Sequence, residues 1–206
     1  MLCGVVLSGG DSRRMGSPKA LLTDADGVPF IIRIVESMRE AGLTDIVVVT
    51  GNHHDAIADV LMRSSVHGVR IVRNPDPSRG QLSSLWTAMD ACVAGTEGLA
   101  MTLVDVPMLA PATIAQVVEA WRRTRAPIVR PAYGQRRGHP VIFDRAVFDE
   151  LRRAPAELGA RVVVSAHYDE VVNVVVDDPG CVVDIDTPDE YRRAMGSVQD
   201  NERGPE

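Results

Sequence analysis

An apolar run followed by two glycines and two cations lies near the beginning of the chain. Val5–Leu7 is apolar, Gly9-Gly10 follows after one serine, and Arg14 and Lys19 come soon after. Glycines let backbone N–H groups approach a ligand closely, and arginine and lysine supply charge for phosphate oxygens. The pattern indicates a nucleoside triphosphate site. A basic surface loop is the alternative, and the combination of strand, glycines and cations argues against it.

The spacing of this segment differs from both common nucleotide motifs. A P-loop needs a lysine directly after its second glycine, but Gly16 is separated from Lys19 by two residues. A dinucleotide fingerprint needs G-x-G-x-x-G, which Gly9-Gly10 followed by Asp11 does not provide. The segment therefore predicts phosphate binding of another type.

Three aspartates are candidates for holding a divalent metal ion. Asp105 follows the apolar run Leu99–Val104, so we expect it at the carboxyl end of a central strand, where open α/β sheets bind ligands. Asp184 and Asp186 alternate with apolar residues and would share one face of a strand. Carboxylates gathered in this way suit Mg²⁺, which prefers oxygen ligands and bridges substrate phosphates.

Each of these polar groups also has a structural alternative. Asp105 can cap the turn before Pro107, and Asp186 can be the N-cap of a helix that begins at Pro188. Ser83 or Ser84 can cap the helix that begins nearby, although capping and ligand contact can coexist. The metal assignment leaves open whether Asp184, Asp186 or both participate.

Alternating strand and helix patterns must position these groups. The predicted strands are Gly4–Ser8, Ile46–Thr50, Val69–Arg73, Leu99–Val104, Pro127–Arg130, Val171–Val176 and Val182–Ile185. The predicted helices are Phe30–Ala41, Ala56–Arg63, Leu82–Val93, Pro111–Thr124, Ala146–Arg153, Gly159–Ala166 and Pro188–Met195. This order predicts a single-domain α/β fold with a mainly parallel open sheet and helices on both faces. The Tyr133–Phe143 segment breaks the rhythm and predicts an antiparallel strand or hairpin in the second half of the chain.

Composition narrows the class of protein. The 206 residues carry a net charge of −6 and contain no long Lys/Arg run, which argues against nucleic acid as the main partner. No apolar run approaches the roughly 20 residues that a membrane span needs, and the first residues do not resemble a signal peptide, so we expect a cytoplasmic protein. We expect one domain over residues 1–196 and a disordered tail over 197–206. The three cysteines are expected to be free thiols in apolar surroundings.

Five motifs in one order resemble a known family. They are Leu7–Leu22, Gly80–Leu85, Asp105–Leu109, Gly138–Val141 and Asp184–Asp189. Together they are similar to the motifs of the MobA-like nucleotidyltransferases, and within that family to molybdenum cofactor cytidylyltransferases. The resemblance implies a Rossmann-like nucleotidyltransferase fold and a Mg²⁺-dependent transfer of a nucleotidyl group from CTP to the phosphate of molybdopterin, with a molybdenum enzyme as a potential recipient of the product.

The motifs also suggest a role for each site residue. Catalytic roles fall to Arg14, Lys19 and Asp105, and metal contacts to Asp105, Asp184 and Asp186. The expected nucleotide-binding residues are Leu7, Ser8, Gly9, Gly10, Ser12, Arg14, Lys19, Gln81, Leu82, Ser83 and Ser84. The expected acceptor-binding residues are Gly138, His139 and Pro140.

The sequence contains conflicting indications of which nucleotide base the protein binds. Cytidylyltransferases usually read Leu-Ala-Ala-Gly where this chain has Leu7-Ser8-Gly9-Gly10, and their guanylyl relatives have glycine at the position of Gly9. We expect the missing methyl to leave room for a purine, whereas Gln81–Leu85 favours the cytidylyl branch. GTP is therefore an alternative to CTP, and methylerythritol phosphate or a sugar phosphate is an alternative acceptor.

Two further functions belong to other classes. A non-catalytic protein that binds nucleotide or pterin for delivery would use the same glycines without needing the three aspartates. An oxidoreductase that uses a nicotinamide cofactor is a third possibility, and the missing dinucleotide fingerprint argues against it.

Overall fold

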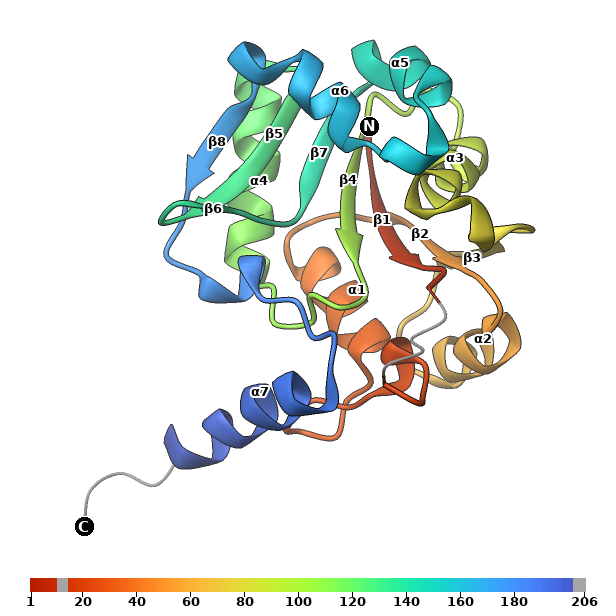
Figure 1. Cartoon of the computed structure of the whole chain (residues 1–206), viewed down its shortest axis with the longest axis vertical. Coiled ribbons are helices and arrows are strands. Elements are labelled where there is room, and N and C mark those ends of the chain that lie inside the picture. The colour runs from red at the N-terminus through yellow and green to blue at the C-terminus, as the bar shows by residue number, and fades with distance from the viewer. Residues whose placement is uncertain (11–14, 202–206) are drawn as a thin grey trace.

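One mixed sheet organises the molecule, with strand order β3-β2-β1-β4-β7-β5-β6 and β8 paired with β5 (Figure 1). The computed structural model describes residues 1–10 and 15–201, and their side chains as far as Met195. The strands are β1 (Leu2–Ser8), β2 (Asp45–Thr50), β3 (Val69–Arg73), β4 (Gly98–Leu103), β5 (Ile128–Tyr133), β6 (Arg136–Arg137), β7 (Val141–Asp144) and β8 (Val172–Val175). The pairings from β3 through β4 are parallel, and β7 runs antiparallel to both of its neighbours. The predicted fold class is confirmed.

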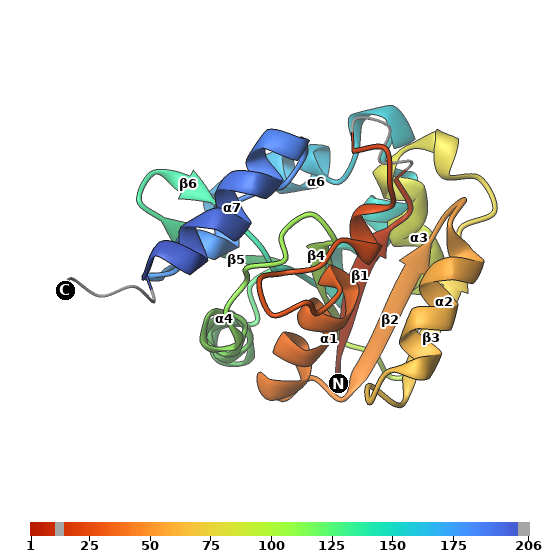
Figure 2. The ribbon, with the colours of Figure 1, turned by 90° about the horizontal axis from the view of Figure 1, so that it is seen from below.

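Helices cover both faces of the sheet (Figures 1 and 2). They are α1 (Phe30–Glu40), α2 (His54–Arg63), α3 (Gln81–Ala91), α4 (Pro111–Thr124), α5 (Phe148–Arg153), α6 (Arg161–Ala166) and α7 (Pro188–Asn201). Apolar residues of α1, α2 and α4 pack with one face of the sheet, and those of α3, α5 and α6 pack with the other. Across the part of the chain described, no helix combines the length and apolar character needed to cross a membrane.

The central strands are apolar on both sides because both faces are covered. Every residue of β1 is buried, as is every residue of β2 after Asp45. The parallel register between β1 and β4 places Leu7 opposite Leu103. The carboxyl ends of the two strands therefore meet at the same edge of the sheet, and this edge carries the residues that follow each strand.

The second half of the chain confirms one sequence prediction and corrects another. The expected hairpin is present, since β5 and β6 pair antiparallel around Gly134. The predicted strand Val182–Ile185 is wrong, because Pro179–Val182 forms a 3-10 turn in which the Asp178 carboxylate accepts a hydrogen bond from the Gly180 N–H. The residues after this turn make separate backbone contacts with loops instead of a ladder.

Helix α7 begins where the sequence predicts and continues beyond Met195 to Asn201. Its first turn is a capping box, in which the Glu190 N–H donates to Thr187 Oγ1 and Glu190 Oε2 accepts from the Thr187 N–H. Thr187 is therefore the cap, and the interpretation of Asp186 as the N-cap is wrong. The assignment of residues 197–206 to a tail stays a prediction.

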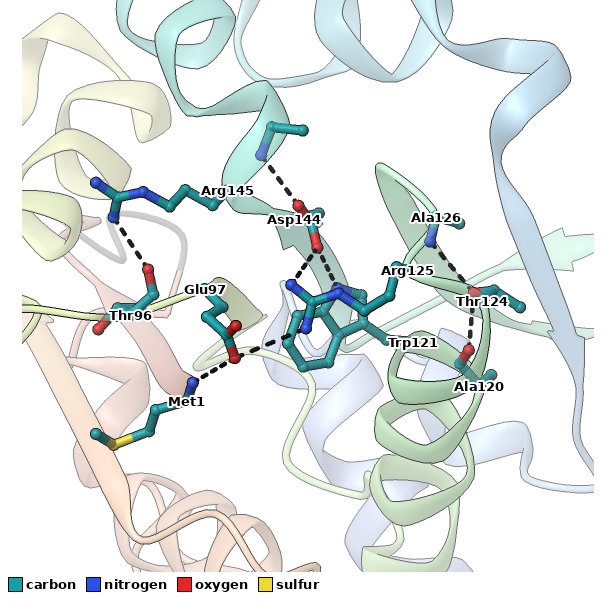
Figure 3. A network of polar contacts seen from close by, with 11 residues as sticks. Met1, Thr96, Glu97, Ala120, Trp121, Thr124, Arg125, Ala126, Asp144 and Arg145 are labelled. Carbon is teal, nitrogen blue, oxygen red and sulfur yellow. Dashed lines mark hydrogen bonds and ion pairs between the residues drawn. The ribbon is translucent and has the colours of Figure 1, made fainter.

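A polar network holds the opposite edge of the sheet together (Figure 3). Trp121 Nε1 of α4 donates to Asp144 Oδ2 at 3.0 Å, and the Arg125 guanidinium lies 3.4 Å from the same oxygen. Arg125 also stacks over the Trp121 ring at 4.3 Å. Arg145 donates to the Thr96 carbonyl at 3.0 Å, which joins the end of β7 to the loop before β4. These contacts fix β7 and α4 relative to β4, which carries the site residue Asp105 just beyond its other end.

The three cysteines are free thiols, as the sequence predicts, but two of them interact. A hydrogen bond between Cys3 and Cys92, together with burial, raises the pKa of the Cys3 thiol. Burial raises the pKa of Cys181 to about 11. Cys92 is partly exposed, whereas Cys3 and Cys181 are buried.

We expect one cysteine to react with an alkylating reagent in the native protein. At pH 8, iodoacetamide should modify Cys92 within minutes, and Cys3 and Cys181 only after unfolding, because thiolates are the reactive form and buried thiols are shielded. Peptide mass spectrometry before and after denaturation measures this order. Modification of Cys181 at the same rate as Cys92 would contradict the assignment.

Candidate active site

A cavity of about 380 Å³ lies at the carboxyl ends of β1 and β4. Its wall comes from the turn after β1, the start of α2, the segment before α3 and the residues after β4. The lining residues are Leu7, Ser8, Gly9, Gly10, Pro18, Lys19, Ala20, His53, Ile57, Pro77, Gly80, Gln81, Ser84, Leu103, Val104, Asp105 and Asp186. Motifs that are far apart in the sequence thus surround one space.

The ammonium group of Lys19 lies between two carboxylates of this cavity. Its Nζ is 3.0 Å from Asp105 Oδ2 and also donates a short hydrogen bond to Asp186 Oδ1. The Lys19 side chain is only 12% exposed. Burial opposes the positive charge, but the contacts with Asp186 and Asp105 outweigh burial and raise the pKa of Lys19. Lys19 is the single lysine of the chain and is fully charged at neutral pH.

Backbone contacts bring the two carboxylates together from residues 81 positions apart. The Ile185 N–H donates to the Asp105 carbonyl at 2.8 Å, so the segment before α7 runs beside the residue that follows β4. Glu190 accepts a hydrogen bond from the Asp186 N–H at 2.9 Å, which fixes the backbone of Asp186 at the start of α7. The Asp105 carboxylate faces Lys19 and makes no capping hydrogen bond in the described structure.

Asp184 and His139 lie beside this pair, outside the residues that line the cavity. Partial burial raises the pKa of Asp184, and the Asp105 carboxylate raises it further. Burial lowers the pKa of His139 despite the nearby carboxylates of Asp105 and Asp184, so its imidazole is neutral at pH 7. A contact of 3.4 Å joins His139 Nδ1 to the Met101 carbonyl. The two residues that flank His139 are buried.

The four residues of the Gln81–Ser84 segment differ in what they face. Gln81 and Ser84 line the cavity, while Leu82 points into the core beneath α3 and packs with its apolar residues. Ser83 donates to the Gly80 carbonyl at 2.7 Å within the first turn of the helix. The cap position itself is Gly80, which has no side chain, so neither serine is the N-cap.

Gly9 packs directly against Ser84. A Cβ at position 9 would lie 2.8 Å from Ser84 Oγ, closer than two such atoms can approach. The hydroxyl group therefore borders the place that a methyl at position 9 would take. The expectation that Gly9 leaves room for a purine stays a prediction.

We expect Gly9→Ala to lower the free energy of unfolding by about 1–2 kcal/mol through overpacking against Ser84. The loss should largely disappear in the Gly9→Ala/Ser84→Ala double variant, which removes the hydroxyl that meets the new methyl. Gly10→Ala is the matched control, because a Cβ there meets nothing within 4 Å. Urea unfolding of the wild type and the three variants measures these differences, and equal losses at positions 9 and 10 would contradict the argument.

Several site features fall outside what the sequence predicts. Ser12 and Arg14 lie outside the described residues, so their assigned roles stay predictions. His53 and Ile57 line the cavity although no sequence motif marks them. The structure alone explains why position 51 is a glycine, because a Cβ there would lie 2.4 Å from the Gly9 carbonyl oxygen.

A second cavity of about 740 Å³ adjoins the first. Both include Gly80 and Gln81 in their walls. Met101 of β4 and its pairing partner Val141 of β7 both line the second cavity. Leu103, two residues after Met101 on the same strand, lines the first cavity. The lining of the second cavity combines apolar side chains with the charged side chains of Arg79, Glu157 and Arg161.

The carboxylates of the first cavity fit a hard divalent cation in their chemistry. Both side chains offer oxygen donors, and Asp105 Oδ1 is buried without a hydrogen-bond partner in the described structure. In this structure the positive charge between Asp105 and Asp186 is the Lys19 ammonium group. Within the described residues, no three His, Cys, Asp or Glu side chains form a metal-binding group. A metal contact by all three aspartates stays a prediction.

Comparison with known proteins places the chain in a family. Nicotine blue oxidoreductase of Paenarthrobacter nicotinovorans is 29% identical over 201 residues, which cover 93% of this chain and 95% of that protein. A probable molybdenum cofactor guanylyltransferase of Opitutus terrae is 34% identical over 134 residues, covering 65% of this chain and 62% of that protein. The chain thus spans less than two thirds of the length of that second relative.

Among solved structures, Rv0371c of Mycobacterium tuberculosis H37Rv in complex with manganese has a TM-score of 0.78 and 29% identity over 96% of this chain and 99% of that chain. Residues 4–171 match the model of the MobA-like NTP transferase domain, a stretch that includes the glycine turn, Lys19, the Gln81–Ser84 segment, Asp105 and His139. The chain is a member of the MobA-like NTP transferase family.

Proposed function

We propose that this protein transfers CMP from CTP to the phosphate of molybdopterin and releases pyrophosphate. The observation that carries the proposal is Lys19, held between Asp105 and Asp186 at the wall of a cavity under the Gly9-Gly10 turn. This arrangement offers one cation for phosphate charge and two carboxylates for a metal ion within a single hydrogen-bonded group. The reaction belongs in the cytoplasm, and its product would serve a molybdenum enzyme.

The residues of the cavity would act mainly by position and charge. A phosphate oxygen of the acceptor attacks the α-phosphorus of CTP, the bond to the β-phosphate oxygen breaks, and pyrophosphate leaves with the electron pair. The Lys19 ammonium would bind the triphosphate and stabilise charge on the leaving group, joined by Arg14. The backbone N–H groups after β1 can approach the phosphates closely because Gly9 and Gly10 lack side chains.

Asp105 and Asp186 are the residues that would hold a divalent cation, with Asp184 beside them. When bound, Mg²⁺ would neutralise phosphate charge and orient the reacting oxygens. The manganese complex of Rv0371c supports metal use by a related protein. The unpartnered oxygen of Asp105 supports it for this chain.

The similarity of the Gln81–Leu85 segment to the cytidylyl branch supports CTP over GTP. A methyl at position 9 would meet Ser84 Oγ, so the glycine at this position is not by itself an argument for a purine. Gln81 and Ser84 offer polar groups to a base. The adjoining second cavity offers a place for the acceptor, since its lining combines apolar side chains with two arginines and Glu157. It includes Val141, the first residue of β7, which follows the Gly138–Pro140 motif.

A second candidate function is a nicotinamide-dependent oxidoreductase. One observation favours it, since the relative named nicotine blue oxidoreductase aligns over 93% of the chain. Fluorescence titration with NADH and NADPH tests this alternative directly.

A pyrophosphate-release screen tests the proposal. CTP, GTP, ATP and UTP are each supplied with Mg²⁺ or Mn²⁺, with and without molybdopterin. We expect release with CTP only when both metal and molybdopterin are present. Release with GTP instead would establish the guanylyl alternative, and nucleotide binding without release would indicate a delivery protein. Absence of both, with NADPH oxidation, would establish the oxidoreductase.

A further inference from the structure

Asn74 is a buried amide behind the nucleotide cavity that no sequence motif singles out. It lies just after β3, is only 3% exposed, and its N–H donates to the Thr50 carbonyl at 2.8 Å. Its side chain reaches the beginning of α3, where Nδ2 donates to Ser83 Oγ at 2.8 Å and to Ser84 Oγ at 3.0 Å. One amide group therefore contacts both serines of the Gln81–Ser84 segment.

The orientation of this amide is fixed by a neighbouring donor. The Asp76 N–H can only donate, and it lies 3.0 Å from Asn74 Oδ1, so that atom must be the amide oxygen. The nitrogen then faces the two serines, and each of its two hydrogens has one acceptor. Exchange of the amide oxygen and nitrogen would place two N–H donors against each other at Asp76.

This orientation decides what the two hydroxyl groups can do. Each accepts a hydrogen bond from Asn74 and keeps one proton to donate. Ser83 donates its proton to the Gly80 carbonyl at 2.7 Å. Ser84 has no acceptor for its proton in the described structure, and it lines the cavity.

We infer that Asn74 is a positioning residue that makes the Ser84 hydroxyl a hydrogen-bond donor toward the nucleotide base. At this point the cavity then selects a base edge that presents a carbonyl oxygen or a ring nitrogen, and it rejects an exocyclic amino group. The inference rests on the proposed function, in that the cavity must bind a nucleotide. Asn74 itself touches no substrate.

Asn74→Asp tests the inference because a carboxylate can only accept. The Ser84 proton would turn toward the new carboxylate, and the hydroxyl would then face the ligand with its lone pairs. We expect Ser84→Ala to weaken CTP binding about tenfold, the loss of one hydrogen bond to a ligand. Asn74→Asp should weaken CTP binding more, about thirtyfold, because an acceptor then faces an acceptor.

The double variant separates positioning from a structural role. If Asn74 acts through Ser84, Asn74→Asp should change CTP affinity less than about threefold in the Ser84→Ala background. If it acts on the fold in general, its effect should stay about thirtyfold there. Calorimetric titration of CTP into each variant, with no acceptor present, measures the four dissociation constants. In turnover assays KM for CTP should rise while kcat stays within about threefold.

Asn173→Asp is the matched control, since Asn173 is exposed and bonded to Arg130 far from the cavity. We expect unchanged CTP affinity in it. Thermal unfolding checks that each variant folds, and Asn74→Ala, which adds no buried charge, repeats the cycle if Asn74→Asp does not fold. Wild-type protein that binds no nucleotide would overturn this inference together with the proposed function. Nucleotide binding with additive losses in the double variant would overturn this inference alone.

Discussion

Lys19→Ala is expected to lower turnover at saturating substrate by a hundredfold or more while the fold survives. A preorganised cation that meets developing charge contributes about 3 kcal/mol to transition-state stabilisation, which corresponds to more than a hundredfold in rate. Here the cation is held in place by Asp105 and Asp186, so no reorganisation is needed as charge develops. Pyrophosphate release by the purified variant, with CTP, Mg²⁺ and molybdopterin, measures the loss.

The structure offers a matched control for this substitution. Arg152 is also paired with an aspartate, Asp90, but both side chains are exposed and lie away from the cavity. Arg152→Ala should keep normal turnover, because exposed ion pairs contribute little. Near-normal turnover in Lys19→Ala would end the assignment of Lys19 to the reaction.

The single lysine allows an independent measurement. An amine-reactive acylating reagent can modify only Lys19 among the side chains, and CTP should protect it. The raised pKa of Lys19 should keep the reaction slow at pH 7 and speed it as the pH rises, since only the neutral amine reacts. Peptide mass spectrometry follows the modification, and modification that CTP does not slow would place the nucleotide elsewhere.

Asp105→Asn is expected to lower turnover by a hundredfold or more and to raise the metal concentration needed for half-maximal activity. The substitution keeps the shape but removes the charge and replaces one carboxylate oxygen by an amide nitrogen, which does not bind Mg²⁺. Asp186 would still hold Lys19, so the fold and CTP binding should persist. Turnover measured against Mg²⁺ and Mn²⁺ concentration gives both quantities.

Asp90→Asn serves as the control for this second change, because Asp90 is an exposed aspartate on α3. It should leave the metal dependence unaltered. If Asp105→Asn kept the metal dependence of the wild type with reduced turnover, Asp105 would act through Lys19 alone. Unchanged turnover would remove Asp105 from the site.

Most of the elements could be predicted from local pattern. The apolar runs in β1, β2 and β4 have few polar interruptions, which is typical of strands that are covered on both faces. The strand predicted at Val182–Ile185 failed because its alternation is also compatible with a 3-10 turn followed by extended chain. The turn is stabilised by Asp178, which caps it, and the extended segment after it is held by the hydrogen bond from the Ile185 N–H to the Asp105 carbonyl.

The types and the order of the candidate site residues could be predicted from the sequence of this protein. The double glycine after a buried strand, the cations that follow and the aspartate after β4 predict phosphate and metal binding, because these groups are specified by neighbouring residues. The tertiary structure alone decided which groups meet. It joined Lys19 to Asp105 and Asp186, filled the space beside Gly9 with Ser84, and placed Asn74 behind both serines. Such contacts depend on loops from distant parts of the chain, whose relative positions are set by the parallel register of the sheet and carry no local signal.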